Sequence, residues 1–141
     1  MQFSRAVDYA LRSLAFLAAL PPGTVATRSN LARETRVADA FLAKVMRKLV
    51  RAHLVKSHPG VHGGFTLRLL PEQISLMHVV EAVDGPWNMQ ACLLHSEPCG
   101  HRDWCGVHDA LAGVRNETIR VLKTTTLAQI SAPPLTKIST A

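Results

Sequence analysis

One stretch of the chain constrains its fold more than any other: a helical pattern with a basic face, followed at once by a glycine-rich hairpin pattern. Apolar residues from Leu42 to Leu49 recur at i, i+3, i+4 and i+7, which predicts one buried helix face. Asp39 is expected to cap this helix, which would run to about His53. The basic residues follow the same spacing two positions later, on the opposite face. They are Lys44, Arg47, Lys48 and Arg51.

The segments on either side of this helix complete a recognisable pattern. A shorter helix, Thr27–Glu34, precedes it across a tight turn at Thr35–Ala38. After it, Leu54–His58 and Phe65–Leu69 are strand-like, and the residues between them, 59–64, include three glycines, which predicts a β-hairpin. Two helices joined by a tight turn and followed by a hairpin predict a winged helix-turn-helix. The expected fold class is mainly α with a small β-hairpin.

Helices are also predicted on both sides of this unit. Phe3–Leu20 would be capped by Ser4, and a later helix by Ser75, ending at Gly85-Pro86. The apolar side of the first helix is expected to carry Val7, Leu11, Leu14 and Ala18. That of the later helix is expected to carry Leu76, Val79, Val80 and Val83.

The second half of the chain adds a long helix, from Val107 to about Leu122, with one apolar stripe. Because the helix lies outside the compact domain, a second copy of the chain is its expected partner. Folding back on its own domain is the alternative. Thr126–Gln129 resembles a capping box and predicts a last short helix.

The expected segments are therefore four. They are a DNA-binding domain at 1–86, a cysteine-rich loop at 87–106, a dimerisation helix with the short helix at 107–130, and a disordered tail at 131–141.

Basic charge is concentrated in one half of the chain. Residues 1–70 hold eleven Lys and Arg against three Asp and Glu, whereas residues 71–141 hold five against seven. This asymmetry is expected if the first half meets a polyanion, although a solvated basic surface would look the same. No apolar run reaches transmembrane length.

All three cysteines lie in one segment, at Cys92, Cys99 and Cys105, with His108 three residues further. Their odd number argues against a disulfide framework and favours reduced thiols in the cytoplasm. The spacing lacks the close Cys pairs typical of zinc sites. Wider spacing in a loop with glycine and proline favours an iron–sulfur cluster. Zinc, or thiols without a ligand, stay open as alternatives.

The order of these parts resembles the Rrf-two family of bacterial transcription regulators, nearest to its NsrR-like members and also similar to IscR-like and RirA-like ones. The resemblance covers about residues 1–130. It is carried by Asp8–Arg12, Leu42–Leu49, Gly63-Gly64-Phe65, Ile74–Gly85, the three cysteines, and Thr126-Leu127-Ala128.

The resemblance implies a cofactor and its ligands. Cys92, Cys99 and Cys105 would bind an iron–sulfur cluster, with [4Fe–4S] favoured and [2Fe–2S] the alternative. Asp8 of the partner subunit would be the fourth ligand, as in NsrR-like members, with Arg12 offsetting the net charge. His108 is the alternative, as in IscR-like members, although the gap between the first two cysteines is one residue longer here. Without a cluster, Asp8 and Arg12 would form a plain i,i+4 ion pair.

The function expected from these parts is that of a cytoplasmic, homodimeric regulator that binds a palindromic operator in double-stranded DNA, with repression as its effect. The cluster would sense nitric oxide, redox state or iron status and control DNA affinity. Lysines, arginines and the wing would contact mainly phosphate, and the start of the basic helix would face base edges. The expected DNA contacts are Arg28, Ser29, Ala38, Asp39, Ala40, Lys44, Arg47, Lys48, His58, His62 and Gly63.

Two other function classes are weaker. One is a zinc-stabilised winged-helix module that binds DNA or a protein without sensing. The other is an enzyme using Cys105 and His108, for which the sequence offers no third orienting group. We therefore expect no enzymatic activity.

Overall fold

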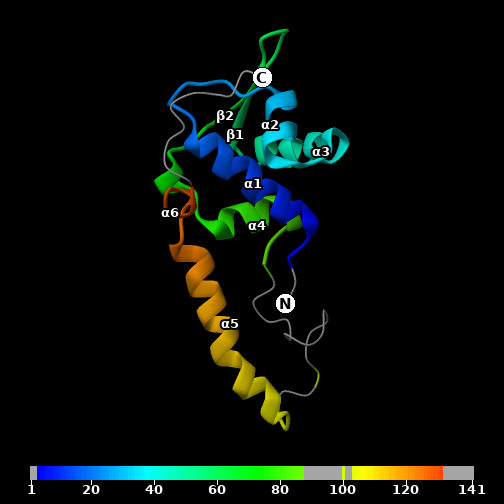
Figure 1. Cartoon of the computed structure of the whole chain (residues 1–141). Coiled ribbons are helices and arrows are strands. Elements are labelled where there is room, and N and C mark those ends of the chain that lie inside the picture. Colours follow the sequence, from blue (N-terminus) through cyan, green and yellow to red (C-terminus); the bar gives the residue numbers. More distant parts are fainter. Residues whose placement is uncertain (1–2, 88–99, 101–102, 132–141) are drawn as a thin grey trace.

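The computed structural model describes residues 3–87, 100 and 103–131. In this part of the chain a compact helical head carries a hairpin at one end, and a long helix projects from the other (Figure 1). The elements are α1 (Arg5–Ala19), α2 (Arg28–Thr35), α3 (Asp39–Arg51), β1 (Val55–His58), β2 (Gly64–Leu67), the 3₁₀ turn η1 (Pro71–Gln73), α4 (Leu76–Asp84), α5 (Gly106–Thr124) and α6 (Leu127–Ile130).

Helix α1 begins as predicted, because the Ser4 side chain accepts a hydrogen bond from the Val7 amide. Its buried face differs from the prediction. Ala10 and Leu17 are buried, whereas Leu11 and Ala18 are only half-buried. The first helix is rich in apolar residues all round, so several stripes fit a 3.6-residue period, and packing decides between them.

The helix-turn-helix is formed by α2 and α3. Thr27 caps α2, and Arg36 ends it in the left-handed conformation at φ 56°. In α3 the predicted core residues are all buried, but the predicted cap is wrong: Ala38 is the N-cap and gives no side-chain hydrogen bond. Asp39 is instead the first helical residue, and its carboxylate pairs with Arg28. The buried residues of α3 are Leu42, Val45, Met46 and Leu49.

The hairpin is antiparallel, with Val55 opposite Leu67 and His58 opposite Gly64. It is anchored to the segment before α2, because the Phe65 amide donates to the Ala26 carbonyl at 2.8 Å and the Ala26 amide donates back at 3.0 Å. A Cβ on Gly64 would lie 2.1 Å from the Ala26 oxygen. Glycine is therefore required at 64 for the wing to lie against the head.

Helix α4 lies beneath α1, and Ser75 caps it as predicted. Val79, Val80 and Val83 are buried, while the predicted Leu76 is half-buried and Met77 takes its place in the core. Gly85 follows the helix at φ 87°, a conformation that favours glycine.

Helix α5 extends away from the head, with its C-terminal end beside α4 and α6 (Figure 1). Leu122 is the one buried residue of α5. The short helix α6 returns to the head: Leu127 is fully buried, and its amide donates to the Ile74 carbonyl at 2.9 Å. No helix among the described residues has the length and hydropathy needed to cross a membrane. The predicted disordered tail begins at 131, and all of it after Ser131 lies outside the described residues.

Candidate nucleic-acid interface and metal-ligand residues

The outer face of α3 is basic, as the sequence predicted. Lys44, Arg47 and Arg51 are all exposed, because the spacing that buries Leu42 and Leu49 turns these residues the other way. Arg47 Nε donates to the Ala43 carbonyl at 3.4 Å. These side chains give the helix a positively charged surface that a phosphate backbone could reach.

Lys48 belongs to the same sequence pattern and is also exposed, but its ammonium group has a partner within the protein. Its Nζ donates to the backbone carbonyl of Val83, at the end of α4, at 2.6 Å. The structure therefore turns this lysine toward the head.

The start of α3 is held by an ion pair. Arg28 Nε lies 2.8 Å from Asp39 Oδ1, and both side chains are more than half exposed. Ser29, Ala38 and Ala40 are exposed beside this pair. The predicted contacts at the beginnings of α2 and α3 therefore lie together on one surface, with the Asp39 charge partly offset by Arg28.

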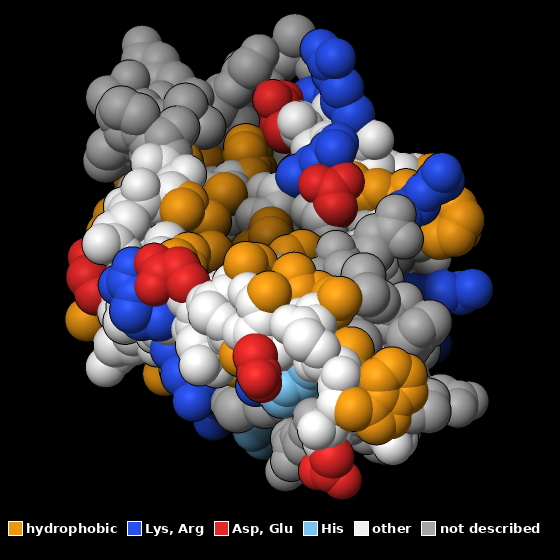
Figure 2. Space-filling view, turned by 90° about the horizontal axis from the view of Figure 1, so that it is seen from below, with side chains coloured by type: hydrophobic (Ala, Val, Ile, Leu, Met, Phe, Trp, Pro, Cys, Tyr) orange, Lys and Arg blue, Asp and Glu red, His pale blue; other side chains and the backbone are white. Residues whose placement is uncertain are grey.

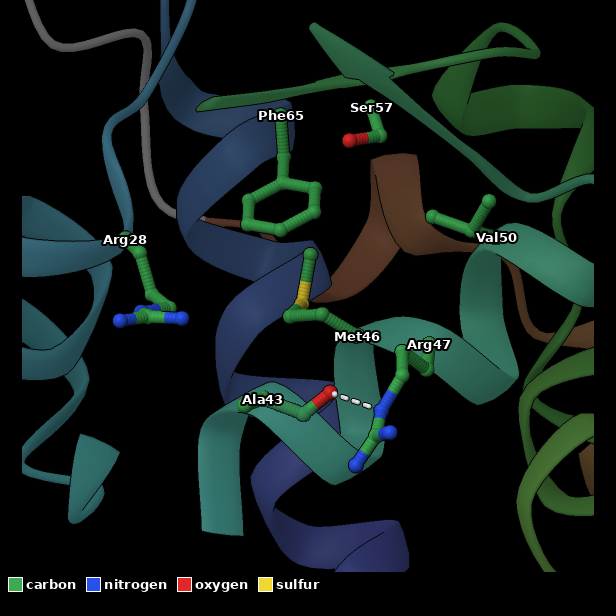
Figure 3. A pocket seen from close by; sticks show the side chains of 7 residues that line it. All are labelled: Arg28, Ala43, Met46, Arg47, Val50, Ser57 and Phe65. Atoms are coloured by element: carbon green, nitrogen blue, oxygen red, sulfur yellow. Dashed lines mark hydrogen bonds between the residues drawn. The ribbon is translucent and has the colours of Figure 1, made fainter. Parts of the chain in front are cut away.

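A groove of about 420 Å³ separates α3 from the hairpin (Figure 3). Arg28 and Arg47 extend along its edges, while the Phe65 ring lies over Met46 at its floor. The groove thus has an apolar floor and cationic edges, which suits contact with a sugar–phosphate strand. Its lining residues are Arg28, Ala43, Met46, Arg47, Val50, Ser57 and Phe65. Sequence reasoning missed Phe65 and Ser57 here, since only the strand register shows which face they take.

The two histidines of the wing are placed differently. His62 is exposed at its tip beside Val61, but the His58 ring lies 2.9 Å from Thr66 Oγ1 and is half-buried. A Cβ on Gly63 would lie 2.1 Å from the His58 carbonyl oxygen. The turn therefore needs glycine at 63 for its own backbone packing, and a contact from Gly63 to DNA stays a prediction.

The metal-ligand candidates are only partly within the described residues. Cys92 and Cys99 lie outside them. Cys105 is a free, half-buried thiol at the N-cap of α5. Among the described residues, no three His, Cys, Asp or Glu side chains gather closely enough to hold a metal ion.

His108 lies one turn into α5, and its amide donates to the Cys105 carbonyl at 3.0 Å. Its side chain is 16% exposed, and its Nδ1 lies 3.1 Å from Asp109 Oδ1. A carboxylate at Nδ1 orients an imidazole so that Nε2 is available as an acceptor.

Asp8 and Arg12 form the i,i+4 pair considered from the sequence. Arg12 Nη2 lies 2.8 Å from Asp8 Oδ2, and Arg12 Nε donates to Oδ1 at 2.9 Å. Both side chains are 49% exposed, so a second subunit could approach either one. A donor set of three thiols and one carboxylate or imidazole is of the kind that holds an iron–sulfur cluster.

Comparison with known proteins identifies the family. The model of the Rrf-two family, described as "Iron-dependent Transcriptional regulator", matches residues 3–133. The chain belongs to this family. The HTH-type transcriptional regulator NsrR of Bacillus subtilis (strain 168) is 30% identical over 112 residues, covering 79% of this chain and 77% of that protein.

Two solved structures share the fold. CymR (YrzC), the global cysteine regulator of B. subtilis, superposes with a TM-score of 0.76 at 21% identity, covering 93% of this chain and 96% of CymR. T. potens IscR gives a TM-score of 0.71 at 21% identity, covering 92% and 85%. The expected winged-helix fold is confirmed, and the chain is a DNA-binding transcriptional regulator of the Rrf-two family.

Proposed function

We propose that this regulator's affinity for DNA is controlled by an iron–sulfur cluster held by Cys92, Cys99 and Cys105, and that the protein is a homodimeric cytoplasmic repressor. The observation that carries the proposal is the three-thiol set itself, in a family described as iron-dependent. Its one described member, Cys105, is a free thiol at the start of α5. A bound cluster, [4Fe–4S] in our proposal, would supply a centre that reacts with nitric oxide and oxidants.

Two residues are candidates for the fourth ligand. Asp8 of the partner subunit stays our first choice, because its carboxylate is half exposed and carries its own balancing cation in Arg12. His108 is the alternative, since Asp109 orients its ring and it follows Cys105 by one helical turn. Substituting the residue that is the ligand is expected to destabilise the cluster more than substituting the other one.

Dimerisation is supported by the apolar residues left exposed on α5. Val107, Val114 and Val121 are 49%, 54% and 39% exposed. They recur at seven-residue spacing, so they lie close to one line along the helix. Hydrophobic side chains extend across the face seen from below (Figure 2). A two-fold dimer through α5 would present two α3 helices to half-sites about 34–36 Å apart.

Anaerobic purification with absorption spectroscopy and native mass spectrometry tests this proposal. The wild type is expected to be brown and to carry one cluster per chain, and nitric oxide is expected to bleach it and to weaken DNA binding. Asp8→Ala should destabilise the cluster more than His108→Ala if Asp8 is the ligand, and less if His108 is. Colourless protein with one zinc per chain would overturn the cluster and favour a zinc-stabilised module.

A further inference from the structure

The C-terminal end of α4 is tied to two other elements of the head. Lys48 of α3 donates from Nζ to the Val83 carbonyl at 2.6 Å. Ser4, the cap of α1, donates from Oγ to Asp84 Oδ1, also at 2.6 Å. The last two residues of α4 are therefore attached both to α3, the second helix of the helix-turn-helix and here called the recognition helix, and to the start of α1.

A third contact continues this attachment beyond the helix. The Phe3 and Trp87 rings lie with their centroids 5.6 Å apart, at an interplanar angle of 45°, and Trp87 packs against the hydrophobic core. Such a tilted aromatic pair contributes about 0.5–1.5 kcal/mol beyond its buried area. The chain thus stays fixed to the head up to residue 87, five residues before Cys92.

The bond from Lys48 has a clear physical basis. The last carbonyls of a helix lack intrahelical donors, and α4 has no basic residue in its own last turn. An ammonium group at this end interacts favourably with the helix dipole and makes a charge-assisted hydrogen bond. Val83 is 4% exposed, whereas Lys48 is an exposed residue, so the bond joins a buried residue to the protein surface. The Lys48 charge is therefore used within the protein.

Lys44 provides the contrast. It lies one turn earlier on α3. Both lysines are exposed, but the Lys44 side chain makes no hydrogen bond or ion pair with any other residue that the structure describes. The two lysines line one groove between α1 and α3. They differ in that only Lys48 makes a hydrogen bond to the end of α4.

We propose that Lys48 is a positioning residue that couples the cysteine segment to the recognition helix, and is not a phosphate contact. The segment that carries Cys92 continues directly from the end of α4. A shift of that end moves the Val83 carbonyl, and the bond from Lys48 passes the shift to α3. The coupling rests on the function proposed for the cysteines, whereas the absence of a phosphate contact does not.

Salt dependence tests the first part, with Lys48→Met and the matched control Lys44→Met. Both variants keep an unbranched side chain and lose only the charged end. Each phosphate neutralised contributes about −0.9 to the slope of log affinity against log salt concentration. All variants are measured on one duplex that the wild type has selected from random sequences. For Lys44→Met the slope should become less negative by about 0.9 per half-site. Lys48→Met should keep the wild-type slope, and an equal loss would overturn the inference.

The coupling is measured as the ratio of DNA affinities of anaerobically purified and chelator-stripped protein. Lys44→Met should keep the wild-type ratio, whereas Lys48→Met should bring the ratio close to one. Lys48→Arg retains a cationic donor and should therefore keep most of the wild-type difference between the two affinities. An unchanged ratio in a folded Lys48→Met protein, checked by circular dichroism, would overturn the coupling. A wild-type ratio of one would instead contradict the function proposed for the cysteines. The salt dependence would still show whether Lys48 contacts a phosphate.

Discussion

Single residues in this head are constrained mainly by backbone packing. Gly64 is the clearest case, because its Cα faces the Ala26 carbonyl across the contact that anchors the hairpin. A side chain there would force β2 away from Ala26. The glycine that looks like part of a flexible loop in the sequence is therefore a fixed packing position.

Replacing Gly64 with Ala is expected to destabilise the protein by about 1–3 kcal/mol, the usual cost of forcing an added methyl into a packed site. Gly113→Ala is a matched control with the opposite expected sign. A Cβ at 113 meets nothing within 4 Å, and alanine in a helix interior is favoured over glycine by about 0.5–1 kcal/mol. Urea unfolding of both variants measures the difference. Equal stability of the two would contradict this account of Gly64.

One ion pair on α5 joins neighbouring side chains at the surface. On α5, Arg120 Nε donates to Glu117 Oε2 at 2.8 Å, and this hydrogen bond lowers the pKa of the Glu117 carboxyl. Because the two side chains are 62% and 59% exposed, such a surface pair adds little to stability.

At the scale of elements, the start of α3 is unusual because no side chain caps it. Thr27 caps α2 through a hydrogen bond from the Asn30 amide at 3.1 Å, whereas Ala38 offers α3 no side-chain cap. The recognition helix therefore begins with amides that no N-cap side chain satisfies, at the surface expected to face DNA.

Ala38→Ser should supply the missing cap and raise the free energy of unfolding by about 1 kcal/mol. The Ala38 backbone is already extended, at φ −59° and ψ 137°, so serine fits without rearrangement. Thr27→Ala, at the neighbouring cap, should lower the free energy of unfolding by a similar amount. Chemical denaturation checks both, and no gain in Ala38→Ser would show that the α3 amides already have partners.

Most elements could be predicted from the sequence, because helices and strands follow the periodicity of apolar residues. The hairpin, the core face of α3 and the caps at Ser4 and Ser75 are examples. Asp39 was misassigned because its partner, Arg28, lies on another helix, and only the tertiary structure brings them together. The bond from Lys48 to Val83 could not be predicted for the same reason, because its two residues lie on different helices.

The types of residue in the candidate site could be predicted from the sequence, whereas their arrangement in space was harder to predict. Spacing placed Lys44 and Arg47 on the outer face of α3, and the structure confirms their exposure. The groove against Phe65 depends on how the hairpin packs on α3, which no local pattern encodes. The cluster ligands stay a prediction, with Cys105 the one cysteine whose surroundings are described.

At the scale of the whole molecule, the hairpin and the free end of α5 lie at opposite ends (Figure 1). The exposed valines of α5 can thus be covered by a second copy without hiding α3 or the wing. In the coupling proposed above, a signal from the cysteine segment would reach α3 through the end of α4.

Val114→Glu is expected to break the proposed dimer. Each copy would lose one buried valine, worth about 1.5–3 kcal/mol, and two copies meet in a symmetric interface. The dissociation constant should therefore rise by at least about 100-fold. Asn116→Glu adds the same charge on another side of α5 and should leave the dimer intact. Sedimentation at several concentrations distinguishes them, and an unchanged dimer in Val114→Glu would place the interface elsewhere.

The return of α6 to the head has a consequence for how the protein is made. Leu127, together with Leu122 of α5, completes a core whose other buried residues all lie at or before Val83, and the Leu127 amide donates to the Ile74 carbonyl. The ribosome must therefore synthesise the cysteine segment and all of α5 before the DNA-binding head can close. A nascent chain cannot occupy an operator with a finished head until every candidate cluster ligand has already been built.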